Sequence, residues 1–187
     1  MTIEIQSLTA AIGAEVRGVD LATKLSDINV RLLREALLEN LVLVFRDQDL
    51  TPENHIAVAR AFGEIKHPPV ATAHGGPPEI NVLDQTEPRG EGADAWHADN
   101  TYTSAPPMGS LLRVLQLPGV GGDTAFASMY AAYEALSDRM KAHLEGLEAY
   151  HDSYQPYAQE VRPEMYDADK GTDYIRDRRA KYVPSLH

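Results

Sequence analysis

The sequence predicts a mixed α/β fold in which a β core is flanked by helices. Three observations indicate this: short apolar segments typical of strands, helical apolar periodicity behind good N-cap residues, and turns rich in Gly and Pro between them. The chain has 187 residues, 43% of them hydrophobic, and a chain of this size can bury a core of its own. We therefore expect residues 1–187 to form a single domain.

The N-terminal third alternates predicted strands and helices. Ile3–Ile5 and Ala14–Val19 alternate like half-buried strands, and Ser26 is a suitable cap for an amphipathic helix. The continuous apolar run Leu41–Phe45 predicts a fully buried strand. Thr51, followed by a proline at the first helical position, predicts a second helix that ends before the next glycine.

The middle of the chain, from His67 to Ala95, is a long segment rich in Pro, Gly and acids, with one strand-like piece at Ile80–Leu83. Loops of such length inside a compact domain are usually functional or disordered. The segment is therefore a candidate lid over a functional site, and a solvated acidic surface loop is the alternative.

Beyond this loop the sequence predicts one further strand and two helices. Gly109–Leu117 reads as the strand, and Ser128 and Ser137 are plausible caps of the two helices. The tail from Tyr150 to Tyr182 has no clear period, so we expect it to be irregular with at most a short helix.

Composition excludes several classes of function. With 17 basic against 28 acidic side chains the net charge is −11, which disfavours nucleic acid as a partner because phosphate contacts need a basic face. The chain has no Cys, so any metal must be held by His, Asp or Glu. The N-terminus lacks the features of a signal peptide, and no apolar run is long enough to span a bilayer. We expect a cytoplasmic protein with no membrane partner.

His97 and Asp99 are the candidate metal ligands. On a strand, residues i and i+2 point to the same face, so both side chains could bind one ion and supply two ligands of a two-His, one-carboxylate site. His143 and Glu145 have the same spacing in a helical segment, where residues two apart point about 200° apart and cannot chelate an ion. On spacing alone, a hydrogen-bonded His–Asp pair without metal remains an alternative.

Several motifs, in order along the chain, resemble one known family. The motifs are Ile12–Leu21, Val44–Arg46, Ala61–Glu64, Trp96–Tyr102, Pro106–Pro107, Leu117–Pro118, Gly121–Thr124 and Ser128–Ser137. Their order and spacing resemble the taurine dioxygenase and 2,4-dichlorophenoxyacetate dioxygenase family of Fe(II)/2-oxoglutarate enzymes. The resemblance covers most of the chain and weakens after about Asp152.

The resemblance implies a double-stranded β-helix, or jelly roll, with flanking helices. It implies an enzyme that uses O₂ and 2-oxoglutarate to hydroxylate a small organic acid, of the sulfonate or aryloxyalkanoate class, with release of succinate and CO₂. His97 and Asp99 would be Fe(II) ligands, and the hydroxyl of Thr124 would help to bind 2-oxoglutarate. A Thr that caps its own strand end is the alternative for the last residue.

The resemblance also implies two substrate-binding residues. His67 matches a His that contacts the anionic group of the substrate in the taurine branch, and Tyr102 matches an aromatic position that lines the pocket. An ordinary loop His and an aromatic residue of the core are the respective alternatives. Val70 stands where the taurine branch has a Tyr, which disfavours taurine itself as the substrate.

The family's third iron ligand is a His far along the chain from the first pair, closely followed by an Arg that binds 2-oxoglutarate. His143 and His151 lie in the wrong segments for that ligand, and Tyr182–His187 resembles the approach to the next core strand. We therefore expect the N-terminal part of the family fold, incomplete at its C-terminal end.

Two other classes of function remain open from the sequence. A non-catalytic jelly-roll module that binds a small molecule or a protein would share the fold, although it would not need His97 and Asp99 together with Thr124. A cupin-like metal hydrolase or isomerase would use the same His and Asp without 2-oxoglutarate. A homo-oligomer is compatible with each of these functions.

Overall fold

The structure is a computed structural model that describes residues 2–65, 76–83, 96–101, 103, 105–151 and 185–186. The chain forms two compact units. The first comprises Met1–Asp84 and Leu111–Lys141, and the second comprises Gln85–Ser110 and Ala142–His187. The organisation of residues 1–187 as a single domain stays a prediction.

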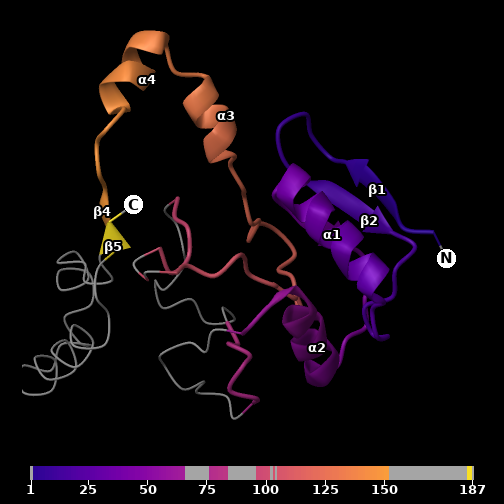
Figure 1. Cartoon of the computed structure of the whole chain (residues 1–187). Coiled ribbons are helices and arrows are strands. Elements are labelled where there is room, and N and C mark those ends of the chain that lie inside the picture. Colours follow the sequence, from indigo (N-terminus) through magenta and orange to yellow (C-terminus); the bar gives the residue numbers. More distant parts are fainter. Residues whose placement is uncertain are drawn as a thin grey trace, which may run out of the picture. The chain divides into compact units, whose positions relative to one another are not determined.

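A three-stranded sheet lies in the first unit (Figure 1). Strand β1 (Glu4–Ser7) pairs antiparallel with β2 (Ala14–Arg17), and β2 pairs parallel with β3 (Leu43–Phe45). The connections explain this mixed pairing, because a short loop suffices between antiparallel strands, whereas parallel strands need a crossover. Helix α1 (Asp27–Asn40) provides that crossover between β2 and β3.

Helices α1 and α2 begin at the predicted caps. The Ser26 hydroxyl accepts a hydrogen bond from the backbone N–H of Asn29 at 3.2 Å. Thr51 and Asn54 form a reciprocal capping box at the start of α2 (Pro52–Phe62), which ends one residue before a glycine. Each cap satisfies an N–H group that has no partner within the helix, and both predicted helices are confirmed.

The predicted strand Leu41–Phe45 is shorter in the structure. Leu41 has a left-handed backbone, with φ of 66°, and its N–H donates to the carbonyl of Leu37 at 2.7 Å as the end of α1. Strand β3 therefore starts at Leu43, and its residues are half-buried rather than fully buried. The prediction is wrong on both points. The strand starts late because the helix cap uses the first residue of the apolar run.

The core of the first unit holds α2 in place. Leu21, Leu50 and Val58 form a buried cluster, and the partly buried Phe45 and Phe62 pack against it. Full burial of one such aliphatic side chain contributes roughly 1.5–3 kcal/mol. The cluster thus joins β3, the loops and α2 through apolar contact.

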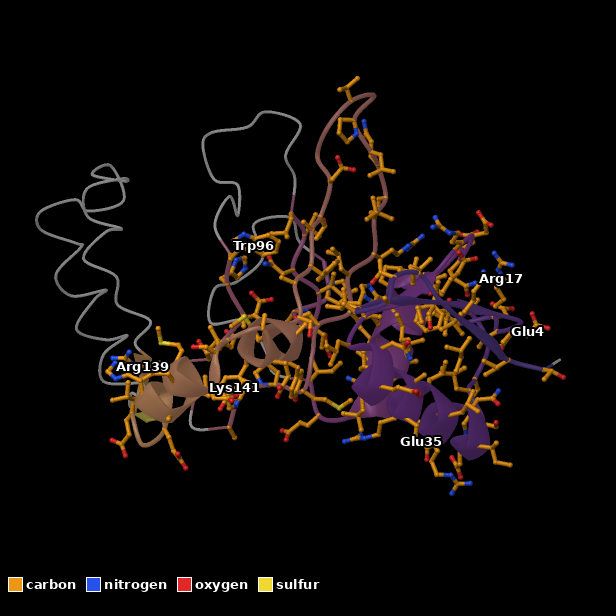
Figure 2. All side chains as sticks on the ribbon, turned by 90° about the horizontal axis from the view of Figure 1, so that it is seen from above. Glu4, Arg17, Glu35, Trp96, Arg139 and Lys141 are labelled. Carbon is orange, nitrogen blue, oxygen red and sulfur yellow. The ribbon has the colours of Figure 1, made fainter. Side chains whose placement is uncertain are left out.

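A charged cluster lies on the central strand of the same sheet. Glu15, which is only 8% exposed, accepts hydrogen bonds from Nε of Arg17 at 2.7 Å and Nε of Arg46 at 3.0 Å. These bonds, first that of Arg17 and then that of Arg46, lower the pKa of the Glu15 carboxyl. Figure 2 shows Arg17 close to Glu4, its cross-strand neighbour. The carboxylate therefore links β2 to the residue that follows β3.

Two polar contacts join the distant sequence segments of the first unit. Nε2 of His55, on α2, lies 3.0 Å from the carbonyl oxygen of Leu111. Nη2 of Arg113 lies 3.6 Å from a carboxylate oxygen of Asp49. The segment that begins at Leu111 is thereby attached to the N-terminal part of its own unit.

Two short helices follow, as the caps predict. Ser128 precedes α3 (Met129–Glu134), and Ser137 precedes α4 (Asp138–Leu144). The two serine hydroxyls accept backbone N–H hydrogen bonds at 3.1 Å and 3.3 Å respectively. Among the described residues, none of the helices combines the length and the apolar character that crossing a bilayer requires.

The C-terminal region contributes a second, two-stranded sheet. Strand β4 (Tyr150–His151) pairs antiparallel with β5 (Ser185–Leu186). Most of the tail predicted to be irregular, Tyr150–Tyr182, lies outside the described residues.

Two predicted strands are wrong. Gly109–Leu117 and Ile80–Leu83 have no strand structure, and Leu112 and Val114 are 59% and 58% exposed. A strand requires a hydrogen-bonded neighbour, and an apolar run does not specify one. Mixed α/β structure is thus present, with short strands and helices in the described residues.

Candidate metal centre

His97 and Asp99 lie together in the second unit. Nε2 of His97 is 3.3 Å from Oδ1 of Asp99, and the two side chains are 55% and 57% exposed. Trp96, the residue directly before His97, has an exposed side chain, and Figure 2 labels it. The structure therefore brings an imidazole nitrogen and a carboxylate oxygen to one accessible place on the second unit.

The two side chains meet because of a turn and not because of a strand. The spacing argument assumed strand geometry at this place, whereas Asp99–Thr101 form a turn. Asn100 has φ of 55°, a left-handed conformation that Asn tolerates better than most residues. The N–H and Oγ1 of Thr103 both donate to the Asn100 carbonyl, at 3.1 Å and 2.9 Å. This turn fixes the backbone that carries Asp99.

Ser110 belongs to the same site, although the sequence did not indicate it. Its Oγ donates a hydrogen bond to Oδ2 of Asp99 at 3.2 Å. A serine at the start of an apolar segment has no pattern that distinguishes it from any other surface serine. The contact is visible only once the chain has folded back over the ten residues between the two positions.

The pair of atoms fits two adjacent ligands of one divalent ion. Imidazole and carboxylate ligands lie about 2.1 Å from a first-row ion such as Zn²⁺. Two ligands at that distance are about 3.0 Å apart at a right angle and about 3.4 Å apart at a tetrahedral angle. The observed 3.3 Å lies between these values. Within the described ranges there is no group of three or more potential ligands, so the pair supplies two.

Thr124 lies in the first unit, on the segment predicted to bind 2-oxoglutarate. Two successive glycines with left-handed backbones precede it, Gly121 with φ of 76° and Gly122 with φ of 75°. Gly122 also lies against the ring of Pro118, because a Cβ added there would be 2.9 Å from Cγ. Both the backbone conformation and the available space therefore favour glycine at Gly122. The role of Thr124 stays a prediction.

The two predicted substrate-binding residues, His67 and Tyr102, lie outside the described residues. The same holds for most of the predicted loop His67–Ala95. The roles assigned to these residues remain predictions.

Residues 4–187 match the family described as "Taurine catabolism dioxygenase TauD, TfdA family". The chain belongs to this family. The resemblance drawn from the sequence motifs is thereby confirmed.

Curated relatives extend the comparison. The chain is 36% identical over 170 residues to an alkylsulfatase of Acinetobacter baylyi, covering 88% of this chain and 53% of the relative. It is 40% identical over 152 residues to an (S)-phenoxypropionate/alpha-ketoglutarate-dioxygenase of Sphingobium herbicidovorans, covering 79% and 53% respectively. The chain thus spans about half the length of the curated relatives it matches.

Two solved structures are also similar to this chain. A taurine dioxygenase from Burkholderia xenovorans superposes with a TM-score of 0.72 at 39% identity, over 83% of this chain and 55% of that one. The structure of AAD-2 in complex with Mn(II) and N-oxalylglycine has a TM-score of 0.70 at 28% identity, over 100% of this chain and 64% of that one.

Proposed function

We propose that the protein is an Fe(II)/2-oxoglutarate-dependent dioxygenase that hydroxylates a small organic acid. The observation that carries this proposal is the 3.3 Å approach of His97 Nε2 to Asp99 Oδ1, in a chain of the taurine dioxygenase family. In the overall reaction, one oxygen atom of O₂ enters the substrate as a hydroxyl group. The other enters succinate as 2-oxoglutarate loses CO₂.

Each predicted site residue has a role in this proposal. His97 and Asp99 hold Fe(II) through Nε2 and Oδ1, the two atoms that approach each other. The ion, when bound, supplies the redox chemistry with O₂ and 2-oxoglutarate. Thr124 donates a hydrogen bond from its hydroxyl to the distal carboxylate of 2-oxoglutarate, and His67 and Tyr102 are the proposed substrate-binding residues. In this proposal the complete protein adopts a double-stranded β-helix fold and is cytoplasmic.

The proposed substrate is a small organic anion of the sulfonate or aryloxyalkanoate class. Relatives are named for sulfate esters and for phenoxypropionate, which share an anionic group on a small organic skeleton. A sulfate ester is therefore included among the candidates. Val70 occupies the position where the taurine branch has a Tyr, which disfavours taurine as the substrate.

The test is succinate release by the full-length protein with Fe(II), ascorbate, O₂ and 2-oxoglutarate. The panel of substrates contains alkyl sulfates, aryloxypropionates and alkanesulfonates. We expect substrate-dependent succinate release with at least one class, and its loss in His97→Ala. His143→Ala, a histidine on α4, is the matched control and should retain turnover. Lack of coupled turnover with every class, or full activity in His97→Ala, would contradict the proposal.

A further inference from the structure

We propose that Ser110 is a positioning residue, which orients the carboxylate of Asp99 so that Oδ1 and not Oδ2 is presented to the metal. This inference rests on the proposed function, because it assumes that Asp99 is a metal ligand. Its basis is the division of contacts between the two carboxylate oxygens of Asp99. Oδ2 accepts the Ser110 hydroxyl at 3.2 Å, whereas Oδ1 is the oxygen next to Nε2 of His97 at 3.3 Å.

The carboxylate needs such a partner because its own torsion does not select an orientation. The terminal torsion of an Asp side chain is broad, without sharp staggered wells. The turn at Asp99–Thr101, bonded through Asn100 and Thr103, fixes the backbone at this place. It does not fix the rotation of the carboxylate about its last bond. The Ser110 hydroxyl supplies that constraint from a segment eleven residues further along the chain.

The orientation has a chemical consequence. A carboxylate can bind an ion through one oxygen or through both. A hydrogen bond from Ser110 occupies Oδ2 and favours binding through Oδ1 alone. Single-oxygen binding keeps a coordination position open, and open positions are what a two-His, one-carboxylate site needs for its other ligands. Ser110 thus acts on the metal through Asp99, as hydrogen-bond partners of metal ligands generally do.

The contact is also specific to a hydroxyl at this place. Ser110 has one O–H donor that can rotate toward Oδ2, and Thr would keep that donor. Ala removes it, and Val removes it while keeping the shape of Thr. A role limited to packing would follow the volume of the side chain at this position, whereas the proposed role follows the presence of the hydroxyl.

The experiment measures anaerobic binding of Co(II) to the full-length protein by titration calorimetry and by visible absorption. The variants are Ser110→Ala, Ser110→Thr and Ser110→Val. Ser7→Ala is the matched control, since Ser7 is an exposed serine on β1 in the other unit. Changes in partners of metal ligands typically weaken metal binding by about 10- to 100-fold. Because the site is exposed, we expect about a tenfold loss for Ala and Val.

Ser110→Thr and Ser7→Ala should keep the affinity of the unmodified protein, and only Ala and Val should change the Co(II) spectrum. Equal affinity and identical spectra for Ser110→Ala and the unmodified protein would overturn the inference. If Ser110→Ala does not fold, the comparison of Thr with Val decides. Failure of the unmodified protein to bind Co(II) more tightly than His97→Ala would instead overturn the proposed function, so the two failures are distinguishable.

Discussion

Gly122 lies two residues before Thr124 and combines a left-handed backbone with close approach to a neighbour. Its φ is 75°, and a Cβ added there would be 2.9 Å from Cγ and 3.3 Å from Cδ of Pro118. Gly121 has almost the same φ, 76°, with nothing within 4 Å of an added Cβ. Gly119 has open space around it and no positive φ. The three positions therefore separate the conformational effect of a methyl group from the steric one.

The magnitudes follow from these geometries. A left-handed conformation destabilises a residue with a Cβ by roughly 1–2 kcal/mol. Replacing Gly by Ala also lowers the conformational entropy of the unfolded chain, which offsets about 0.4–1 kcal/mol of that destabilisation. Overlap with a well-placed neighbour typically costs about 1–3 kcal/mol. Gly121→Ala should therefore lower the free energy of unfolding by about 1 kcal/mol, and Gly122→Ala by about 2–3 kcal/mol. Gly119→Ala should be neutral or slightly stabilising.

Thermal unfolding followed by circular dichroism measures these differences. For a chain of this length, a loss of 1 kcal/mol lowers Tm by roughly 2–4 °C, so Gly122→Ala should unfold about 5–10 °C below the unmodified protein. The order of Tm should be Gly119→Ala highest, then Gly121→Ala, then Gly122→Ala. If the Gly121 and Gly122 variants had equal Tm, contact with Pro118 would have no energetic role. If all three matched, the argument from backbone conformation would also be refuted.

Three further predictions concern a ligand, a helix cap and an ion pair. Thr124→Ala should weaken 2-oxoglutarate binding to the full-length protein by about 1–2 kcal/mol, since one hydrogen bond to a carboxylate is lost; unchanged affinity by calorimetry would exclude this role. Thr51→Ala should lower the free energy of unfolding by about 0.5–2 kcal/mol in urea titrations, because it removes the α2 cap, and a midpoint equal to that of Ser7→Ala would contradict the capping argument. The Arg17 and Arg46 hydrogen bonds lower the pKa of Glu15 from its usual 4.5, so their stabilisation is present above about pH 4.5 and is lost as pH falls through the lowered pKa. Glu15→Gln should therefore lower the free energy of unfolding near neutral pH and make it depend less on pH in the acid range. An acid-unfolding curve identical to that of the unmodified protein would contradict this prediction.

Helix starts could be predicted from the sequence because a cap is a local interaction. Ser26 and Thr51 each bond an N–H group three residues further on, and that spacing is visible in the sequence. The strand predicted at Gly109–Leu117 failed because a strand depends on a partner that the local pattern does not name. Leu41 shows the same difficulty at a boundary, since an apolar residue there ends a helix instead of starting a strand.

The candidate site was predicted in part. The spacing of His97 and Asp99 identified two side chains that lie together, although the sequence argument assigned them to a strand and the structure has a turn. The left-handed Asn100 that makes this turn has no strong sequence signal beyond its residue type. Ser110 could not be predicted, because its contact with Asp99 depends on how two segments fold onto each other. The family was predictable because its motifs extend along the chain in a fixed order.

The central claim is that His97 and Asp99 bind one ferrous ion together. Anaerobic titration of the full-length protein with Fe(II) tests it most directly, with His97→Ala, Asp99→Ala and the double variant beside the unmodified protein. We predict one tight site in the unmodified protein, a loss of affinity of at least about tenfold in each single variant, and little further loss in the double variant, because the ligands act on the same ion. Fe(II) affinity that is unchanged by either single substitution would contradict the account.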